Sequence, residues 1–181
     1  MKSVAVLGLG VIALTAGAFI SAGAAAGGVA GRASYFEASV EGGLSARPAG
    51  DVAYGVVGDS ASGVAAFTIT LGGRDSSGAI LFTSLDGRRP APGRYALSDT
   101  SGAGGFRALY VGGSAERPTA LYRARRGTLE ITASSAEHLS GHFSFTGAGF
   151  MAADPSDEGS EVMVAGAFMS TRAPASRPVH P

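Results

Sequence analysis

Two histidines four residues apart, His138 and His142, are the side chains whose type could hold a metal ion or move a proton. On a helix this spacing would place both rings on one face, but residues 139–145 alternate apolar and polar, which predicts a strand. On a strand the two histidines share a face about 13 Å apart, too far for both to bind one ion. We expect two exposed histidines, since a metal site would also need carboxylates from neighbouring strands. His180 lies in a Pro-rich tail and is expected to be inert.

Other arrangements that could support catalysis are weak. No Gly-x-Ser-x-Gly elbow joins a strand to a helix, and the nearest string, residues 58–63, is typical of a hairpin turn. Asp154, Asp157 and Glu158 form an acidic loop that could bind Ca²⁺ weakly, but without the EF-hand spacing we expect a solvated loop. Glycine pairs end strands and open no helix, so no phosphate loop is predicted. The sequence therefore predicts no catalytic, cofactor-binding or metal-binding residue, and a protein that is not an enzyme.

Composition removes further classes of site. The chain of 181 residues has no cysteine, which excludes disulfides, zinc–thiolate sites, thiol nucleophiles and a lipoprotein anchor. Its formal net charge is zero, whereas a nucleic-acid-binding protein normally carries a basic stripe, so no nucleic-acid partner is expected. The densest basic cluster is Arg123, Arg125 and Arg126. We expect it to be a solvated strand end and turn, with a polyanion site as the alternative.

The N-terminus has the three regions of a secretory signal peptide. Lys2 supplies the positive charge, an apolar run spans residues 4–20, and Ala-x-Ala sites end at Ala24 and Ala26. An uncleaved membrane anchor is the alternative, because the apolar run is close to the shortest length that crosses a bilayer. We predict a signal-peptide helix at 1–26, a flexible lead-in at 27–33, a β domain at 34–171 and a disordered Pro-rich tail at 172–181.

The elements that must position any site are short strands. Phe67, Ile69 and Leu71 alternate with threonines, and similar runs recur about every 10–14 residues with Gly, Pro, Asp and Ser between them. No segment after the N-terminus shows a helical period. Short connections favour antiparallel pairing, because parallel strands need long crossovers. We predict one antiparallel β-sandwich or closed barrel of about ten short strands, and the pattern does not choose between the two.

Several motifs together have a familiar order: PAPGRY at residues 90–95, GTLEIT at 127–132, LSGHFSF at 139–145 and VMVAGAF at 162–168. In this order they resemble a pattern (PxPGxY, GTLxIT, LSGxFxF, VxGxF) of uncharacterised exported all-β proteins of bacteria. The resemblance covers residues 63–170 and implies an exported β fold. It carries no activity and no site residues.

The sequence thus predicts a non-catalytic exported β domain, periplasmic or extracellular, with a binding or structural role in the bacterial envelope or outside it. Its partner, a protein or a small molecule, is not identified, and a monomer is expected. Two alternatives stay open. One is a lipocalin-like barrel that carries a small apolar ligand, and the other is a hydrolase with an unrecognised site.

Overall fold

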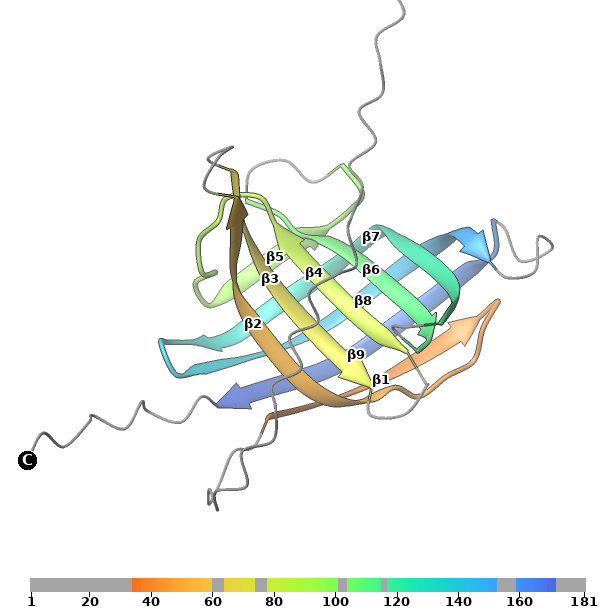
Figure 1. Cartoon of the computed structure of the whole chain (residues 1–181), viewed down its shortest axis with the longest axis horizontal. Coiled ribbons are helices and arrows are strands. Elements are labelled where there is room, and N and C mark those ends of the chain that lie inside the picture. The colour runs from red at the N-terminus through yellow and green to blue at the C-terminus, as the bar shows by residue number, and fades with distance from the viewer. Residues whose placement is uncertain are drawn as a thin grey trace, which may run out of the picture. The chain divides into compact units, whose positions relative to one another are not determined.

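The computed structural model describes residues 34–59, 64–73, 78–100, 104–114, 117–152 and 159–171, and these form nine strands (Figure 1). The predicted signal peptide, lead-in and tail lie outside them. In this described part of the chain, no helix has the length and apolarity needed to cross a membrane. The strands are β1 (Ser34–Gly42), β2 (Ala49–Asp59), β3 (Val64–Gly73), β4 (Ala79–Ser84), β5 (Gly93–Leu97), β6 (Arg107–Gly113), β7 (Pro118–Ser134), β8 (His138–Ala152) and β9 (Glu161–Thr171).

The strands close into a barrel (Figure 1). Neighbours follow the order β7-β6-β4-β3-β2-β1-β9-β8, and β8 pairs again with β7, so eight strands form a ring. The ninth strand, β5, pairs with β7 at Gly93–Leu97, beyond the point where β6 ends its own pairing with β7. All these pairings between strands are antiparallel. The prediction of a single antiparallel β domain is confirmed, and of the two architectures it is the closed barrel that forms.

The predicted number of strands differs because two short runs are one strand. A strand end and turn at the basic cluster would divide residues 118–134 into two strands, but β7 continues through all of them. Its pairing with β8 extends from Ala120 to Ser134 and shifts register three times on the way. The expectation that Arg125 and Arg126 lie at a strand end and turn is therefore wrong. The backbone N–H and C=O groups of this stretch form hydrogen bonds with β8, so the chain stays extended. Irregularities in the ladder bend the strand where a turn was expected.

The inside of the barrel is filled by apolar side chains at alternating positions. Phe82 from β4 lies 5.1 Å from Phe143 of β8, ring centre to ring centre, and 6.5 Å from Phe145. Phe143 in turn stacks at 6.5 Å on Phe168 of β9. The buried set also contains the other inward residues expected from alternation: Phe67, Ile69, Leu71, Leu129, Ile131, Leu139, Val162 and Val164. Aromatic rings from opposite walls of the barrel thus meet in its centre.

Glycines at two inward positions make room for these rings. Gly141 of β8 and Gly166 of β9 occupy places in the alternation where an apolar side chain would otherwise point inward. A Cβ at Gly166 would lie 2.7 Å from the Phe143 ring, and one at Gly141 would lie 3.0 Å from the Phe168 ring. Each would also collide with a backbone carbonyl of the neighbouring strand, that of Glu37 or Glu130. The stacked pair Phe143–Phe168 therefore depends on glycine beneath each ring.

Removing a central ring should be costly. Phe82 has no exposed surface, so Phe82→Ala should lower the free energy of unfolding by about 3–5 kcal/mol through lost burial and the cavity left behind. Chemical denaturation followed by tyrosine fluorescence measures this loss. Val57, which is 62% exposed on β2, supplies the control, and Val57→Ala should change stability by less than about 0.5 kcal/mol. A loss below about 1 kcal/mol for Phe82→Ala would show that the interior is not packed.

Candidate functional site

The basic cluster lies on the outer wall of the barrel, at an irregularity in β7. Ala124 pairs with Gly147 and Arg126 pairs with Thr146, so Arg125 is an extra residue in β7 with no partner of its own in β8. Such a bulge interrupts the alternation of side chains. Ala124 points inward and is buried, whereas both Arg125 and Arg126 are exposed, as is Arg123. Three arginines within four residues thus project from the same side of one strand.

A fourth arginine joins them from the next strand. Leu109 of β6 pairs with Arg123, and Arg107 lies two residues from Leu109 along β6 with its side chain exposed. Arg107 is therefore a diagonal neighbour of Arg123, at about 7–8 Å between Cα atoms. The sequence predicted the first three arginines as a group but gave no indication of Arg107, because only the register of β6 against β7 brings it there. We call Arg107, Arg123, Arg125 and Arg126 the arginine stripe.

The strand neighbours of the arginine stripe carry no negative charge. The residues paired with its members on adjoining strands are Thr83, Leu109, Thr146 and Ala148, all neutral. Among the residues that the structure describes, no carboxylate makes an ion pair with Arg107, Arg125 or Arg126. Arg94 of β5 provides the contrast: it pairs across the ladder with Glu130, and its Nε lies 3.4 Å from the Glu130 carboxylate.

Side chains with hydroxyl groups lie next to the arginine stripe on the outer face of β7 and β8. Arg126 pairs with Thr146, and the next outward pair along the β7–β8 ladder is Thr128 with Ser144. Thr128 and Ser144 are both exposed. The outer face therefore offers guanidinium groups followed by aliphatic hydroxyls, which can donate and accept hydrogen bonds.

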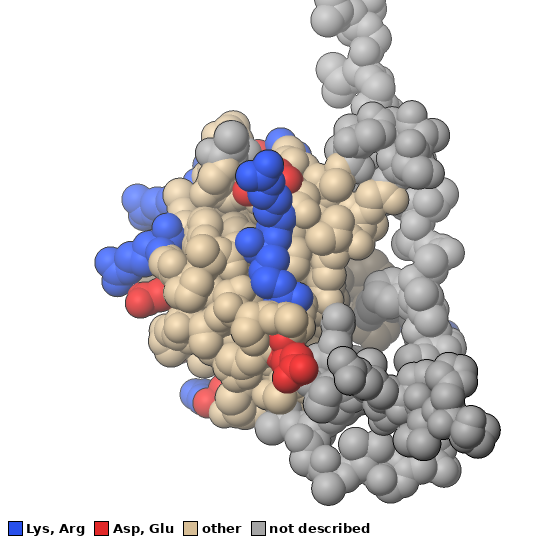
Figure 2. Space-filling view, turned by 90° about the vertical axis from the view of Figure 1, so that its left-hand side faces the viewer, with Lys and Arg blue, Asp and Glu red and all other residues tan. Residues whose placement is uncertain are grey.

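The arginine stripe stands out against an acidic domain. Residues 34–171 contain all 14 carboxylates of the chain but only 10 of its arginines, which gives this stretch a formal charge of −4. The charges on the surface are unevenly distributed in general: on the face shown in Figure 2, basic side chains form a band and project at the left-hand edge, and acidic side chains lie near the ends of the band. Local positive potential thus comes from clustering, and the net charge conceals it.

The two histidines that precede the C-terminal tail, His138 and His142, both lie on β8, as predicted from the alternation. The expectation of two exposed histidines is wrong for His138, which is half-buried, with its Nδ1 at hydrogen-bond distance (3.2 Å) from the Thr171 hydroxyl. His142 is exposed and pairs across the ladder with Glu130, whose carboxylate is held by Arg94. The described residues contain no group of three or more His, Asp or Glu side chains that could hold a metal ion. The acidic loop around Asp154 lies outside the described residues, as does most of the 58–63 string.

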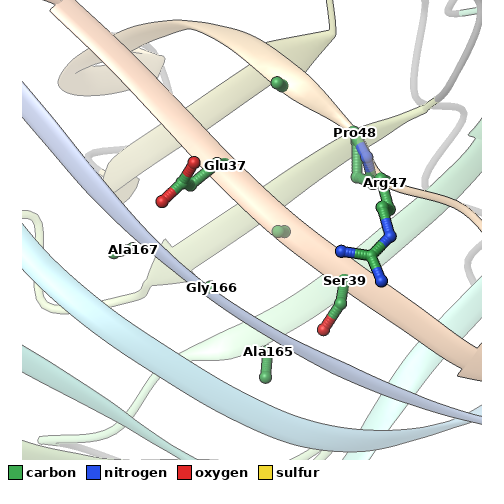
Figure 3. Close-up of a pocket in the computed structure, with 9 residues that line it drawn as sticks. Glu37, Ser39, Arg47, Pro48, Ala165, Gly166 and Ala167 are labelled. Atoms are coloured by element: carbon green, nitrogen blue, oxygen red, sulfur yellow. The ribbon is translucent and has the colours of Figure 1, made fainter.

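A shallow groove of about 500 Å³ lies on the outer face of β1 and β9 (Figure 3). Its floor consists of small residues, among them Ser39, Ala165 and Ala167, and Glu37 and Arg47 flank it. Figure 3 shows the two charged side chains on different sides of the groove. The groove therefore has opposite charges at its margins and no deep apolar surface.

A second hollow, of about 490 Å³, lies at the end of the barrel where the β1–β2 loop and the β6–β7 turn meet. Leu44 and Arg117 line its rim, and Tyr110, whose ring stacks on Tyr122 at 6.0 Å, belongs to its base. Burial, together with the neighbouring Tyr122 phenol, raises the pKa of Tyr110 to about 12. We call this hollow the end cup.

The raised pKa has a consequence for stability. An unfolded tyrosine ionises near pH 10, so the folded state holds the Tyr110 proton more tightly, and the resulting stabilisation is complete below that pH. As pH rises from 10 to 12 the protein should lose about 2 kcal/mol of stability, which denaturation at a series of pH values measures. Tyr110→Phe should remove this fall, whereas Tyr35→Phe, on the exposed outer face, should leave it in place. An unchanged pH dependence in Tyr110→Phe would contradict the assignment.

Comparison with known proteins adds no relative. A scan of protein-family models, a search of curated proteins and a search of solved structures each find no significant match to this chain. The resemblance to exported all-β bacterial proteins therefore stays a prediction.

Proposed function

We propose that this protein is a non-catalytic binding or structural module that works outside the cytoplasm, in the bacterial envelope or beyond it. The observation that carries this proposal is the filled interior of the barrel, which leaves the outer wall and the ends as the places for contact with other molecules. The signal-peptide pattern of residues 1–26 supports export.

The barrel end opposite the end cup is held closed by side chains, which supports a role for the outer surface and not for the interior. Arg89, from the β4–β5 connection, lies over the Tyr54 ring at 4.9 Å and over the Phe67 ring at 5.9 Å. It also donates a hydrogen bond to the carbonyl of Ser135 in the β7–β8 turn. The Arg89 guanidinium therefore connects the two aromatic rings of β2 and β3 to the β7–β8 turn and stabilises this end of the barrel. We infer that ligands do not enter the barrel there.

A carrier of a small apolar ligand is the second candidate, and the end cup favours it. Its volume, about 490 Å³, lies within the range of ligand pockets. Below the cup, however, the Tyr110 and Tyr122 rings and the phenylalanines occupy the interior. A carried ligand would therefore sit at the rim, half in solvent, and not inside as in a lipocalin-type barrel.

A hydrolase has less support. His142 lies beside Glu130, but Arg94 already binds that carboxylate, and in the described part of the chain no hydroxyl forms a hydrogen bond with His142. On the same face of β8, the Ser140 hydroxyl is already bonded to the Thr132 hydroxyl at 2.9 Å. Such a group has no nucleophile activated by a base, which hydrolysis by a triad requires.

Export and the absence of catalysis can be tested on the protein as a host secretes it. Expression of the full chain in a bacterium, followed by cell fractionation and intact-mass measurement, should give a protein outside the cytoplasm that begins at residue 25 or 27. A full-length chain retained in the cytoplasm would overturn the location. The same preparation should not turn over ester or glycoside substrates, and turnover that His142→Gln abolishes would overturn the non-catalytic role.

A further inference from the structure

We propose that the end cup binds a small organic acid, with its carboxylate at Arg117 and its short apolar part against Leu44 and Ala46. This inference rests on the proposed binding role and names the class of ligand. It depends on three features of this end of the barrel: an interior that ends short of the rim, walls fixed by backbone hydrogen bonds, and a lining divided into an apolar wall and a polar rim.

The hollow exists because the inward side chains become small at this end of the barrel. Tyr110 of β6 pairs with Tyr122 of β7. Two residues further towards the end, the next inward pair is Gly112 with Ala120, so only one methyl group lies above the tyrosine rings. Leu44 reaches into part of this space, since a Cβ on Gly112 would lie 3.2 Å from the Leu44 Cδ2. The remaining volume, about 490 Å³, opens to solvent and lies within the range of ligand pockets.

Backbone hydrogen bonds fix both walls of the end cup. In the β1–β2 loop, Ala46 and Val40 exchange two bonds, of 2.9 and 3.1 Å. In the β6–β7 turn, the Arg117 N–H donates to the Ser114 carbonyl at 3.1 Å and to the Ser114 hydroxyl at 3.0 Å. Gly113 precedes this turn with a φ of 81°, which residues with a side chain rarely adopt. The walls are therefore held in place by the fold itself, which lowers the entropy lost when a ligand binds.

The lining of the end cup divides into an apolar wall and a polar rim. Leu44 and Ala46 pack against the buried core and supply the apolar wall. The rim consists of hydroxyl groups and one guanidinium group, from Ser45, Ser114, Thr119 and Arg117. Arg117 is exposed, and among the residues that the structure describes no carboxylate forms an ion pair with it. A ligand with an apolar part and an anionic group would use both regions, whereas a hydrocarbon or a sugar would use only one.

The shape of the end cup and the chemistry of its rim specify the two parts of the ligand. A guanidinium group can donate two parallel hydrogen bonds to the oxygens of a carboxylate, and the neighbouring hydroxyls can donate to the same oxygens. Tyr110 lies below the cup with no exposed surface, so the ligand cannot extend into the barrel and its apolar part must be short. At the opposite end, Arg89 is already engaged by the Tyr54 ring and the Ser135 carbonyl.

The experiment uses octanoate as the probe and octanol, which has the same chain without the charge, for comparison. Amide NMR spectra of the isotope-labelled protein, as a host secretes it, give both the dissociation constant and the location of binding during a titration. We expect saturable binding of octanoate with the largest shifts in residues 44–46 and 113–119, and weaker binding of octanol at the same place. Shifts centred elsewhere on the barrel, or no saturation with octanoate, would overturn the inference.

Arg117→Gln tests the contact with the carboxylate, and Arg88→Gln removes the same charge at another exposed position. Arg117→Gln should weaken octanoate binding about three- to tenfold, the range expected for a hydrogen-bonded charge that is partly exposed. It should leave octanol binding unchanged, and Arg88→Gln should change neither. Equal losses for octanoate and octanol, or equal effects of the two arginine variants on octanoate, would overturn the assignment of Arg117.

Ala46→Leu tests the hollow itself, because the larger side chain takes up space against the apolar wall. Ala53→Leu adds the same atoms on the exposed face of β2 and serves as the control. Ala46→Leu should weaken octanoate and octanol alike, by about tenfold, as a steric misfit in a small apolar pocket does. Unchanged binding in a variant whose melting temperature matches the parent would contradict the site. If Ala46→Leu does not fold, the comparison of Arg117→Gln with Arg88→Gln decides.

Failure of this inference and failure of the proposed function give different results. A protein that is exported and inert but does not bind octanoate would overturn the ligand class and leave the non-catalytic role in place. Hydrolysis of octanoate esters, or retention of the chain in the cytoplasm, would instead overturn the proposed function.

Discussion

The fold depends on the ladder between β7 and β8, which closes the sheet on itself. Without it the nine strands would form an open sheet with two long unpaired edges, the kind of surface that invites aggregation. Closure gives every strand of the ring two neighbours and separates an inner face from an outer one. Closure also determines the volume that the core must occupy, because eight strands enclose a space that side chains can fill. The phenylalanines of β4, β8 and β9 occupy that volume, and Gly141 and Gly166 leave the room for their rings.

The same closure explains how the arginine stripe forms. A sheet that closes into a barrel must bend and shear, and irregularities in long strands supply part of the bend. In β7 one of these irregularities lies between Ala124 and Arg126. Strict alternation would have pointed Arg125 and Arg126 to opposite faces, with one of them inside an apolar core. The extra residue instead keeps Ala124 inside and both arginines outside, so one feature serves both the curvature of the wall and its charge.

Much of the fold follows from local patterns, and the rest depends on contacts that are distant in sequence. Runs such as Phe67–Leu71 and Leu139–Phe145 predict their strands and inward faces, because alternation reports burial on one side. The same alternation fits a sandwich and a barrel equally, so closure was not predictable. The Arg125–Arg126–Gly127 string has the composition of a turn, and only the partner strand β8 keeps it extended. For the same reason the arginine cluster was recognisable from the sequence, but its outward direction and the contribution of Arg107 were not.

The filled interior leaves the outer face of the barrel as the main surface for contact with other molecules. In barrels that hold ligands, binding energy comes from apolar burial inside, and the outer face only has to stay soluble. Here apolar burial already stabilises the fold itself, through rings that contact one another. What the outer wall can add is hydrogen bonding and charge, which work best where like charges gather without counter-ions from the same chain. Among the described residues, no carboxylate pairs with Arg107, Arg125 or Arg126, whereas Arg94 lies 3.4 Å from the Glu130 carboxylate. Because the rings fill the interior, the outer wall and the ends of the barrel are the surfaces left for the binding or structural role proposed above.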